Sequence, residues 1–105
     1  MIIEYDKPYL EELYRTGDIK SKKYRFPDQV KKKYVKVVTM LESISRKEDL
    51  YRYNSLNYEA LSGNKSGTES VRVNDKYRIE FTTRIEGDES IVTICRLLEL
   101  SNHYQ

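Results

Sequence analysis

The segment SGNKSGTESVRVNDKYRIEF, residues 62–81, carries the clearest β-hairpin pattern in the chain. Two glycines, Gly63 and Gly67, supply the positive-φ conformations that a tight reversal requires. Apolar residues then recur at every second position in the runs 71–73 and 77–81, which is the period of a half-buried strand. The polar residues between these runs favour a turn. The sequence therefore predicts an antiparallel hairpin.

The same alternation assigns each side chain of the hairpin to one of two faces. The buried face holds the apolar residues Val71, Val73, Tyr77, Ile79 and Phe81. The opposite face holds the charged residues Arg72, Arg78 and Glu80. We therefore expect a rigid sheet that presents its arginines outward, to solvent.

Two helices are predicted before the hairpin. Pro8 begins the first helix, and Gly17 ends it as a left-handed cap. Pro27 is the expected first residue of a longer helix, with Asp28 in its positively charged first turn. Apolar residues with a 3.6-residue period form the core stripe of this second helix: Val30, Tyr34, Val37, Val38, Leu41 and Ile44. This stripe should pack across one face of the sheet.

Strands and connections account for the rest of the chain. Residues 1–5 are suited to an edge strand, and 91–100 are apolar on both parities, which is typical of a central strand. Residues 45–50 predict a turn or a single helical turn, 51–61 an extended connection, and 86–88 another reversal. The prediction is one α+β domain spanning the whole chain, with an N-terminal strand and two helices packed on one face of a small antiparallel sheet.

The composition limits the possible classes of protein. Charged residues make up 34% of the 105 residues, and no apolar run approaches the roughly 20 residues of a membrane span. The N-terminus lacks the pattern of a signal peptide, so we expect a cytoplasmic protein without membrane contacts. One cysteine, Cys95, and one histidine, His103, cannot form a disulfide framework or a Cys/His zinc site. We therefore expect no metal and no cofactor, with Cys95 as a small core residue.

Positive charge is concentrated in one segment, although the net charge is only +2. Between Lys20 and Lys36 the chain has eight lysines and arginines, including Lys31, Lys32 and Lys33, against the single acid Asp28. Such a segment is suited to binding a polyanion, or it is simply the solvated flank of a helix.

Several side chains suit the metal-independent cleavage of RNA. This reaction needs a base for the 2′-hydroxyl, a cation for the phosphorane and an acid for the leaving 5′-oxygen. Arg78 is a candidate for the cation, His103 for the proton donor or acceptor, and Glu59 for the base, while Lys65 is placed to contact phosphate. The alternative is that Arg78 and Glu80 only pair with charges on neighbouring strands.

Three runs of residues carry a resemblance to a known family: 61–67, 70–81 and the apolar segment that ends at 101–104. They resemble the HigB-type toxins, the plasmid maintenance system killer branch of the RelE/ParE superfamily. The resemblance implies the toxin of a type II toxin–antitoxin pair. Its expected antitoxin is HigA-like and has a helix-turn-helix domain. The implied activity is cleavage of mRNA in the ribosomal A site, as an endoribonuclease that uses no metal and contacts ribosomal RNA.

The resemblance also implies roles for individual residues. Arg78 matches the phosphate-stabilising arginine of the family, and His103 matches its C-terminal histidine. Glu59, Ser62 and Asn102 depart from the family's histidine, lysine and tyrosine, and Lys65, Tyr104 or Glu59 are the candidate substitutes. The full expected RNA- and ribosome-binding set is Lys31, Lys32, Lys33, Lys65, Arg72 and Tyr104.

These departures keep two other functions open. One is a ParE-like toxin that inhibits gyrase and has no nuclease chemistry. The other is a catalytically degenerate toxin fold that acts with its antitoxin as a binding and co-repressor module.

Overall fold

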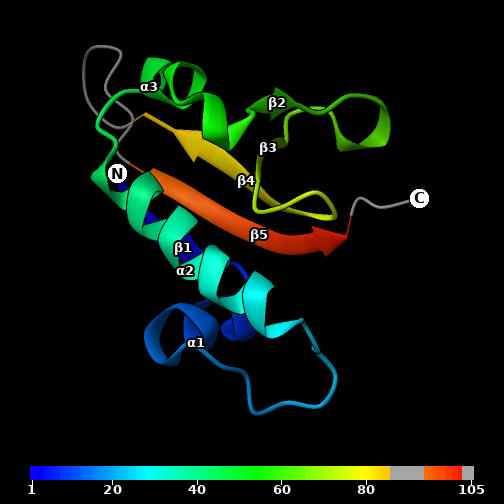
Figure 1. Ribbon diagram of the computed structural model, residues 1–105. Helices are drawn as coiled ribbons and strands as arrows, with labels where there is room; N and C mark the ends of the chain where they lie inside the picture. The colour runs from blue at the N-terminus through cyan, green and yellow to red at the C-terminus, as the bar shows by residue number, and fades with distance from the viewer. Residues whose placement is uncertain (86–93, 103–105) are drawn as a thin grey trace.

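A computed structural model of the chain describes residues 1–85 and 94–102. Its strands are β1 (Ile2–Tyr5), β2 (Glu59–Ala60), β3 (Glu69–Arg72), β4 (Tyr77–Arg84) and β5 (Ile94–Asn102). Its helices are α1 (Pro8–Thr16), α2 (Asp28–Ser43) and α3 (Glu48–Arg52), with 3-10 turns η1 (Asn54–Leu56) and η2 (Gly63–Lys65). In Figure 1, α1 and α2 lie across one face of the sheet, so the predicted α+β class is confirmed. No helix in the described part of the chain has both the length and the apolar character to cross a membrane.

The strands form one sheet in the order β1-β5-β4-β3-β2 (Figure 1). All neighbouring pairs are antiparallel except β1 and β5, which run parallel with Ile3 opposite Cys95. The predictions of an edge strand at the N-terminus and an interior strand near the C-terminus are therefore confirmed. The expected reversal at 86–88 and the beginning of the predicted strand at 91–93 lie outside the described residues.

The two predicted helices occur almost as expected. Gly17 ends α1 with φ 79°, and its N–H donates to the carbonyl oxygen of Leu13 at 2.9 Å. α2 starts at Asp28, with Pro27 as its cap instead of its first residue. The whole predicted stripe of α2 is buried in the core together with the apolar face of the hairpin. The packing of this stripe on the sheet therefore follows from its 3.6-residue period.

The prediction of a plain extended connection at 51–61 was wrong. This segment completes α3, forms η1, and then adds the fifth strand, β2, to the sheet edge. Leu56 is buried in the core, and Asn57 takes a left-handed conformation with φ 44° directly after it. Contacts with a distant part of the sheet determine this path, and no local periodicity signals it.

The prediction that Arg78 and Glu80 face solvent was also wrong, although Arg72 is exposed as expected. Arg78 is only 8% exposed and Glu80 only 4% exposed. Asn57 lies over Arg78, and Lys65 lies over Glu80, each through a hydrogen bond. Both faces of β4 are therefore covered at this point, one by the core and the other by the segment that leads into the hairpin.

Cys95 lies fully buried in the core, and burial raises the pKa of its thiol to about 12. Because the thiolate is the reactive species, the folded protein should not react with a thiol reagent at pH 8. Urea should release one reactive thiol per chain, at the same denaturant concentration at which the circular dichroism signal is lost. Rapid labelling of the native protein would contradict this burial.

Candidate functional site

An open cleft of about 350 Å³ lies between the segment that forms η1 and β2 and the β3–β4 hairpin; its lining residues are Asn57, Glu59, Arg72, Asn74, Asp75 and Arg78. Three of the residues selected from the sequence meet here: Glu59, Arg72 and Arg78. The sheet register explains why, because Arg72 on β3 is the direct partner of Arg78 on β4. Glu59 comes from the edge strand β2, where it pairs with Ser70 of β3.

Hydrogen bonds hold the Arg78 guanidinium in one orientation. Its Nε donates to Ser70 Oγ at 2.9 Å, and its Nη2 donates to the carbonyl oxygens of Asn57 and, at 3.4 Å, of Ser70. Its other terminal nitrogen, Nη1, has no bond to any residue that the structure describes. The guanidinium is therefore rigid on one side and has donors left for a ligand in the cleft.

Charges of both signs line the cleft. Burial lowers the pKa of Arg78, the negative charge of Glu59 opposes this shift, and the neighbouring Arg72 adds to it. Arginine keeps its charge in such surroundings, so the cleft contains two guanidinium groups, Arg72 and Arg78, and two carboxylates, Glu59 and Asp75. Asp75 is paired with Arg72 at the rim, which leaves Arg78 and Glu59 as the charges inside the cleft. Forked guanidinium donors match the oxygens of a phosphate, and a carboxylate beside them can accept a proton.

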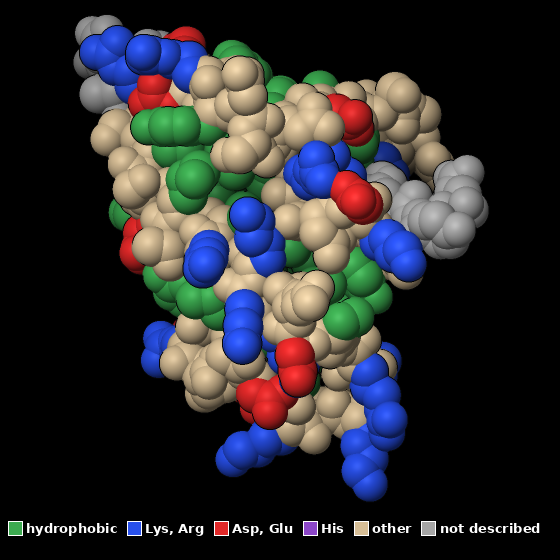
Figure 2. Space-filling model, in the orientation of Figure 1, with side chains coloured by type: hydrophobic (Ala, Val, Ile, Leu, Met, Phe, Trp, Pro, Cys, Tyr) green, Lys and Arg blue, Asp and Glu red, His purple; other side chains and the backbone are tan. Residues whose placement is uncertain are grey.

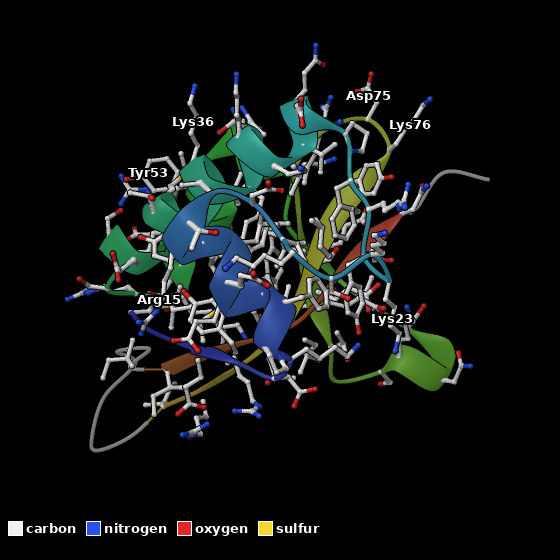
Figure 3. The ribbon with its side chains drawn as sticks, turned by 90° about the horizontal axis from the view of Figure 1, so that it is seen from below. Arg15, Lys23, Lys36, Tyr53, Asp75 and Lys76 are labelled. Carbon is white, nitrogen blue, oxygen red and sulfur yellow. The ribbon has the colours of Figure 1, made fainter. Side chains whose placement is uncertain are left out.

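The turn between β3 and β4 positions Arg72 at the rim of this cleft. Asn74 Oδ1 accepts the backbone N–H groups of Lys76 and Tyr77, each at 2.9 Å, which closes the turn. Asp75 forms an ion pair with Arg72 across it. Figure 3 shows Asp75 and Lys76 pointing outward from the tip of the turn.

A buried carboxylate that sequence reasoning missed anchors the other wall. Glu69 is 7% exposed; its Oε1 accepts the Tyr58 hydroxyl at 2.6 Å, and its Oε2 accepts the Thr83 hydroxyl at 2.8 Å. Lys47 completes the cluster with an ion pair to Glu69 at 3.2 Å. Burial and the hydrogen bond to Glu69 raise the pKa of Tyr58, which stays a protonated donor. A signal for its burial was present in the sequence, because Glu69 lies two residues before Val71 and so falls on the buried face of the period-2 pattern.

The two walls of the cleft are linked through adjacent residues of β3. Glu69 points to one side of the sheet and holds Tyr58, which lies between Asn57 and Glu59 in the chain. Ser70 points to the other side and holds Arg78. The adjacent residues Glu69 and Ser70 therefore fix the positions of both Arg78 and the segment that carries Glu59.

Lys65 lies outside the cleft lining and forms a close pair with Glu80. Its Nζ contacts both carboxylate oxygens, at 3.1 and 2.9 Å, and this bond raises the pKa of Lys65. Glu80 is also the direct strand partner of Glu99. Lys65 therefore offsets a repulsion between two carboxylates within the sheet.

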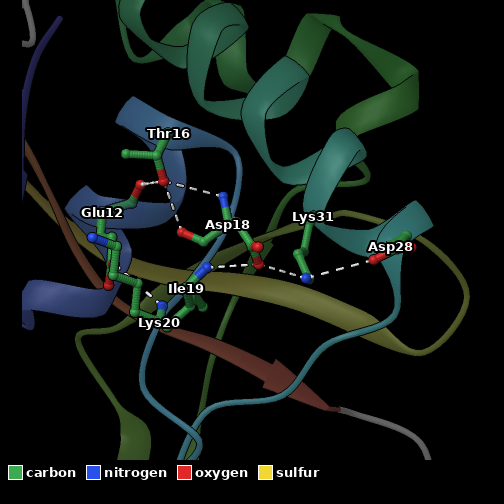
Figure 4. A network of polar contacts seen from close by, with 7 residues as sticks. All are labelled: Glu12, Thr16, Asp18, Ile19, Lys20, Asp28 and Lys31. Carbon is green, nitrogen blue, oxygen red and sulfur yellow. Dashed lines mark hydrogen bonds and ion pairs between the residues drawn. The ribbon is translucent and has the colours of Figure 1, made fainter.

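The three predicted lysines of α2 have different surroundings. Lys31 pairs with Asp18 at 2.7 Å and with Asp28 at 3.5 Å, and this raises the pKa of Lys31 and lowers that of Asp18. In Figure 4 this lysine joins the loop after α1 to the start of α2, with Thr16 bonded to the Asp18 backbone. Lys32 and Lys33 are exposed, and neither forms an ion pair with a described residue.

Two selected residues, His103 and Tyr104, lie outside the described residues. The strand β5 is described as far as Asn102, which pairs with Tyr77, and the preceding Ser101 pairs with Arg78. Among residues 1–85 and 94–102, no group of three or more histidine, cysteine or acidic side chains is arranged to hold a metal ion.

Comparisons with known proteins give matches in structure only. No family model matches the sequence, and no curated protein matches it significantly. A YoeB/ParE toxin from Agrobacterium tumefaciens superposes with a TM-score of 0.54 at 15% identity, covering 99% of this chain and 100% of that one. The YoeB–YefM complex from Staphylococcus aureus gives 0.56 at 23% identity, and the YoeB dimer from the same organism gives 0.53 at 21%, each covering 99% of this chain and 98% of theirs. The chain therefore has the fold of the YoeB/ParE toxins over nearly its full length.

Proposed function

We propose that this protein is the toxin of a type II toxin–antitoxin system and acts as a ribosome-dependent mRNA endoribonuclease that needs no metal. The observation that carries the proposal is a guanidinium held by buried hydrogen bonds at the wall of an open cleft, close to a carboxylate. A shared fold with YoeB toxins supports the toxin class. The finer assignment to the HigB branch rests on the sequence resemblance alone.

The proposed reaction uses the cleft as follows. Glu59 accepts the proton of the ribose 2′-hydroxyl, whose oxygen attacks the adjacent phosphorus. Arg78 donates from Nη1 to a phosphorane oxygen, and Arg72 adds a second positive charge at the rim. His103 protonates the leaving 5′-oxygen, and the other product ends in a 2′,3′-cyclic phosphate. The role of His103 is supported by its position in the sequence, two residues after Ser101, which is the strand partner of Arg78.

An antitoxin is the expected protein partner. A YoeB toxin from Staphylococcus aureus forms a heterotetrameric toxin–antitoxin complex with YefM, and its structure shares the present fold. We propose that a cognate antitoxin neutralises this chain in the same general way. A HigA-like helix-turn-helix antitoxin is the form that the sequence resemblance implies.

Induction of the isolated gene provides the test. We expect growth to stop and new transcript 5′ ends to map within translated reading frames, and an antibiotic that blocks translation initiation should abolish these ends. Co-expression with the cognate antitoxin should restore growth. Intact mRNA together with a DNA-damage response would favour gyrase inhibition instead, and normal growth would favour a non-catalytic co-repressor.

A further inference from the structure

Two further hollows adjoin the cleft through shared lining residues, and the three together are called the groove below. A second hollow of about 460 Å³ adjoins the cleft and shares Arg72 and Asn74 with it. A third, of about 50 Å³, shares Lys33 and Ser55 with the second. The groove therefore begins at the cleft beside Arg78 and passes Asn74 in the β3–β4 turn. It ends at the third hollow, which residues of α2 and η1 line.

Cations follow this groove along its length. Arg72, which is paired with Asp75, lines both the cleft and the second hollow. Lys33 lines the second and third hollows, and Lys36 lines the third. Lys33 and Lys36 lie three residues apart on α2 and so project from one side of the helix. Neither forms an ion pair with any residue in the described part of the chain, unlike Lys31. Figure 2 shows lysine and arginine side chains on this face, over α2 and on toward the β3–β4 turn.

An exposed aromatic ring lies on the same side of the molecule as Lys36, outside the lining of the three hollows. Tyr53 is 49% exposed and lies two residues before Ser55, which lines the second and third hollows. Figure 3 shows Tyr53 and Lys36 on the same side of the molecule. The neighbouring Tyr51 packs edge-on against Tyr58, whereas Tyr53 stacks on no described ring. An exposed ring beside cations is the arrangement on which an unpaired base stacks.

We propose that this groove binds the single-stranded RNA that extends from the cleft, with Arg72, Lys33 and Lys36 contacting successive phosphates and Tyr53 stacking on a base. The inference rests on the proposed function for its substrate class. The lining favours RNA over an acidic peptide, because its polar residues Gln29, Ser55 and Asn74 surround the larger hollow. The part lined by Val37, Met40 and Leu56 has only about 50 Å³, room for roughly a few water molecules and not for a large apolar anchor.

Binding of 2′-O-methyl RNA tests the groove, because such RNA lacks the nucleophile and cannot be cleaved. A dinucleotide that fills only the cleft and a ten-nucleotide strand should be compared by fluorescence anisotropy over a range of salt concentrations. For Lys33→Gln/Lys36→Gln, we expect weaker binding of the long strand alone, and a salt slope reduced by about 1.4 for two lost phosphate contacts. Tyr53→Ala should weaken it about 5- to 150-fold, and Tyr53→Phe should restore it.

The matched control removes the same charge elsewhere. Lys20→Gln/Lys22→Gln lies in the loop after α1, outside the groove, and should leave binding of both strands nearly unchanged. An equal loss in control and groove variants would overturn the proposal, since the effect would then be one of net charge. Unchanged RNA binding in the groove variants, with weaker binding of a synthetic peptide of alternating Glu and Leu, would instead identify a peptide site and also overturn it.

Failure of the groove and failure of the nuclease are separable in these measurements. If wild-type protein cuts transcripts but the groove variants bind the long strand normally, only the groove proposal fails. If the groove variants lose RNA binding while the wild type cuts no transcript, the groove stands and the nuclease proposal fails.

Discussion

Substitution of Arg78 by alanine is expected to lower the rate of RNA cleavage by about 100-fold or more, because it removes a fixed donor aimed at charge that develops in the transition state. Arg78→Lys should recover little of this rate, since an ammonium group cannot reproduce the forked contacts to Ser70 and Asn57. Single-turnover cleavage of mRNA on purified ribosomes measures the effect directly.

The burial of Arg78 makes a folding control necessary. Loss of its side chain leaves the Ser70 hydroxyl and the Asn57 carbonyl without their donor, which by itself costs about 1–3 kcal/mol of stability. Cleavage should therefore be compared at a temperature where urea titration shows the variant to be folded. The control is Arg15→Ala, which changes an exposed residue of α1 that does not line the cleft, and this variant should keep full activity. A folded Arg78→Ala protein that cuts at the wild-type rate would remove Arg78 from the mechanism.

Substitution of Glu69 by alanine is expected to lower the free energy of unfolding by about 3 kcal/mol, through the loss of two hydrogen bonds to a buried carboxylate. Tyr58 and Thr83 would lose their acceptor, and Lys47 would lose its ion pair. Glu69→Gln should cost less, because an amide oxygen can still accept one of the two hydroxyls. Urea denaturation of both variants gives the comparison.

The Glu69 substitution should also lower cleavage in molecules that remain folded. Tyr58 would no longer be tied to β3, so Asn57 and Glu59 would lose their fixed position beside Arg78. The expected sign is a lower turnover rate with little change in RNA affinity, which loss of stability alone does not produce. Glu48→Ala, an exposed acid in the nearby α3, should change the unfolding free energy by less than about 0.5 kcal/mol. Equal effects of Glu48→Ala and Glu69→Ala would contradict the anchoring role.

Part of the candidate site could be predicted from the sequence. The period-2 pattern of the hairpin places Arg72 and Arg78 on one face, and the register of β3 and β4 makes them partners. Residues 57 and 59 had no comparable signal, because a two-residue edge strand is too short to show a period. The hydrogen bond between Arg78 and Asn57 joins residues 21 positions apart, and local patterns carry no information about such a contact.

Local sequence alone determined the two long helices, the hairpin and the set of apolar residues in the core, since each depends on a period of 3.6 or 2 that its own residues contain. Only the tertiary structure decided that β1 runs parallel to β5, where Arg84 and Arg96 both reach Glu4 across the sheet. It also decided that Arg78 is buried and that Glu69 anchors Tyr58. Burial and hydrogen bonding of a polar side chain depend on which distant segments cover it, and that arrangement exists only once the chain has packed.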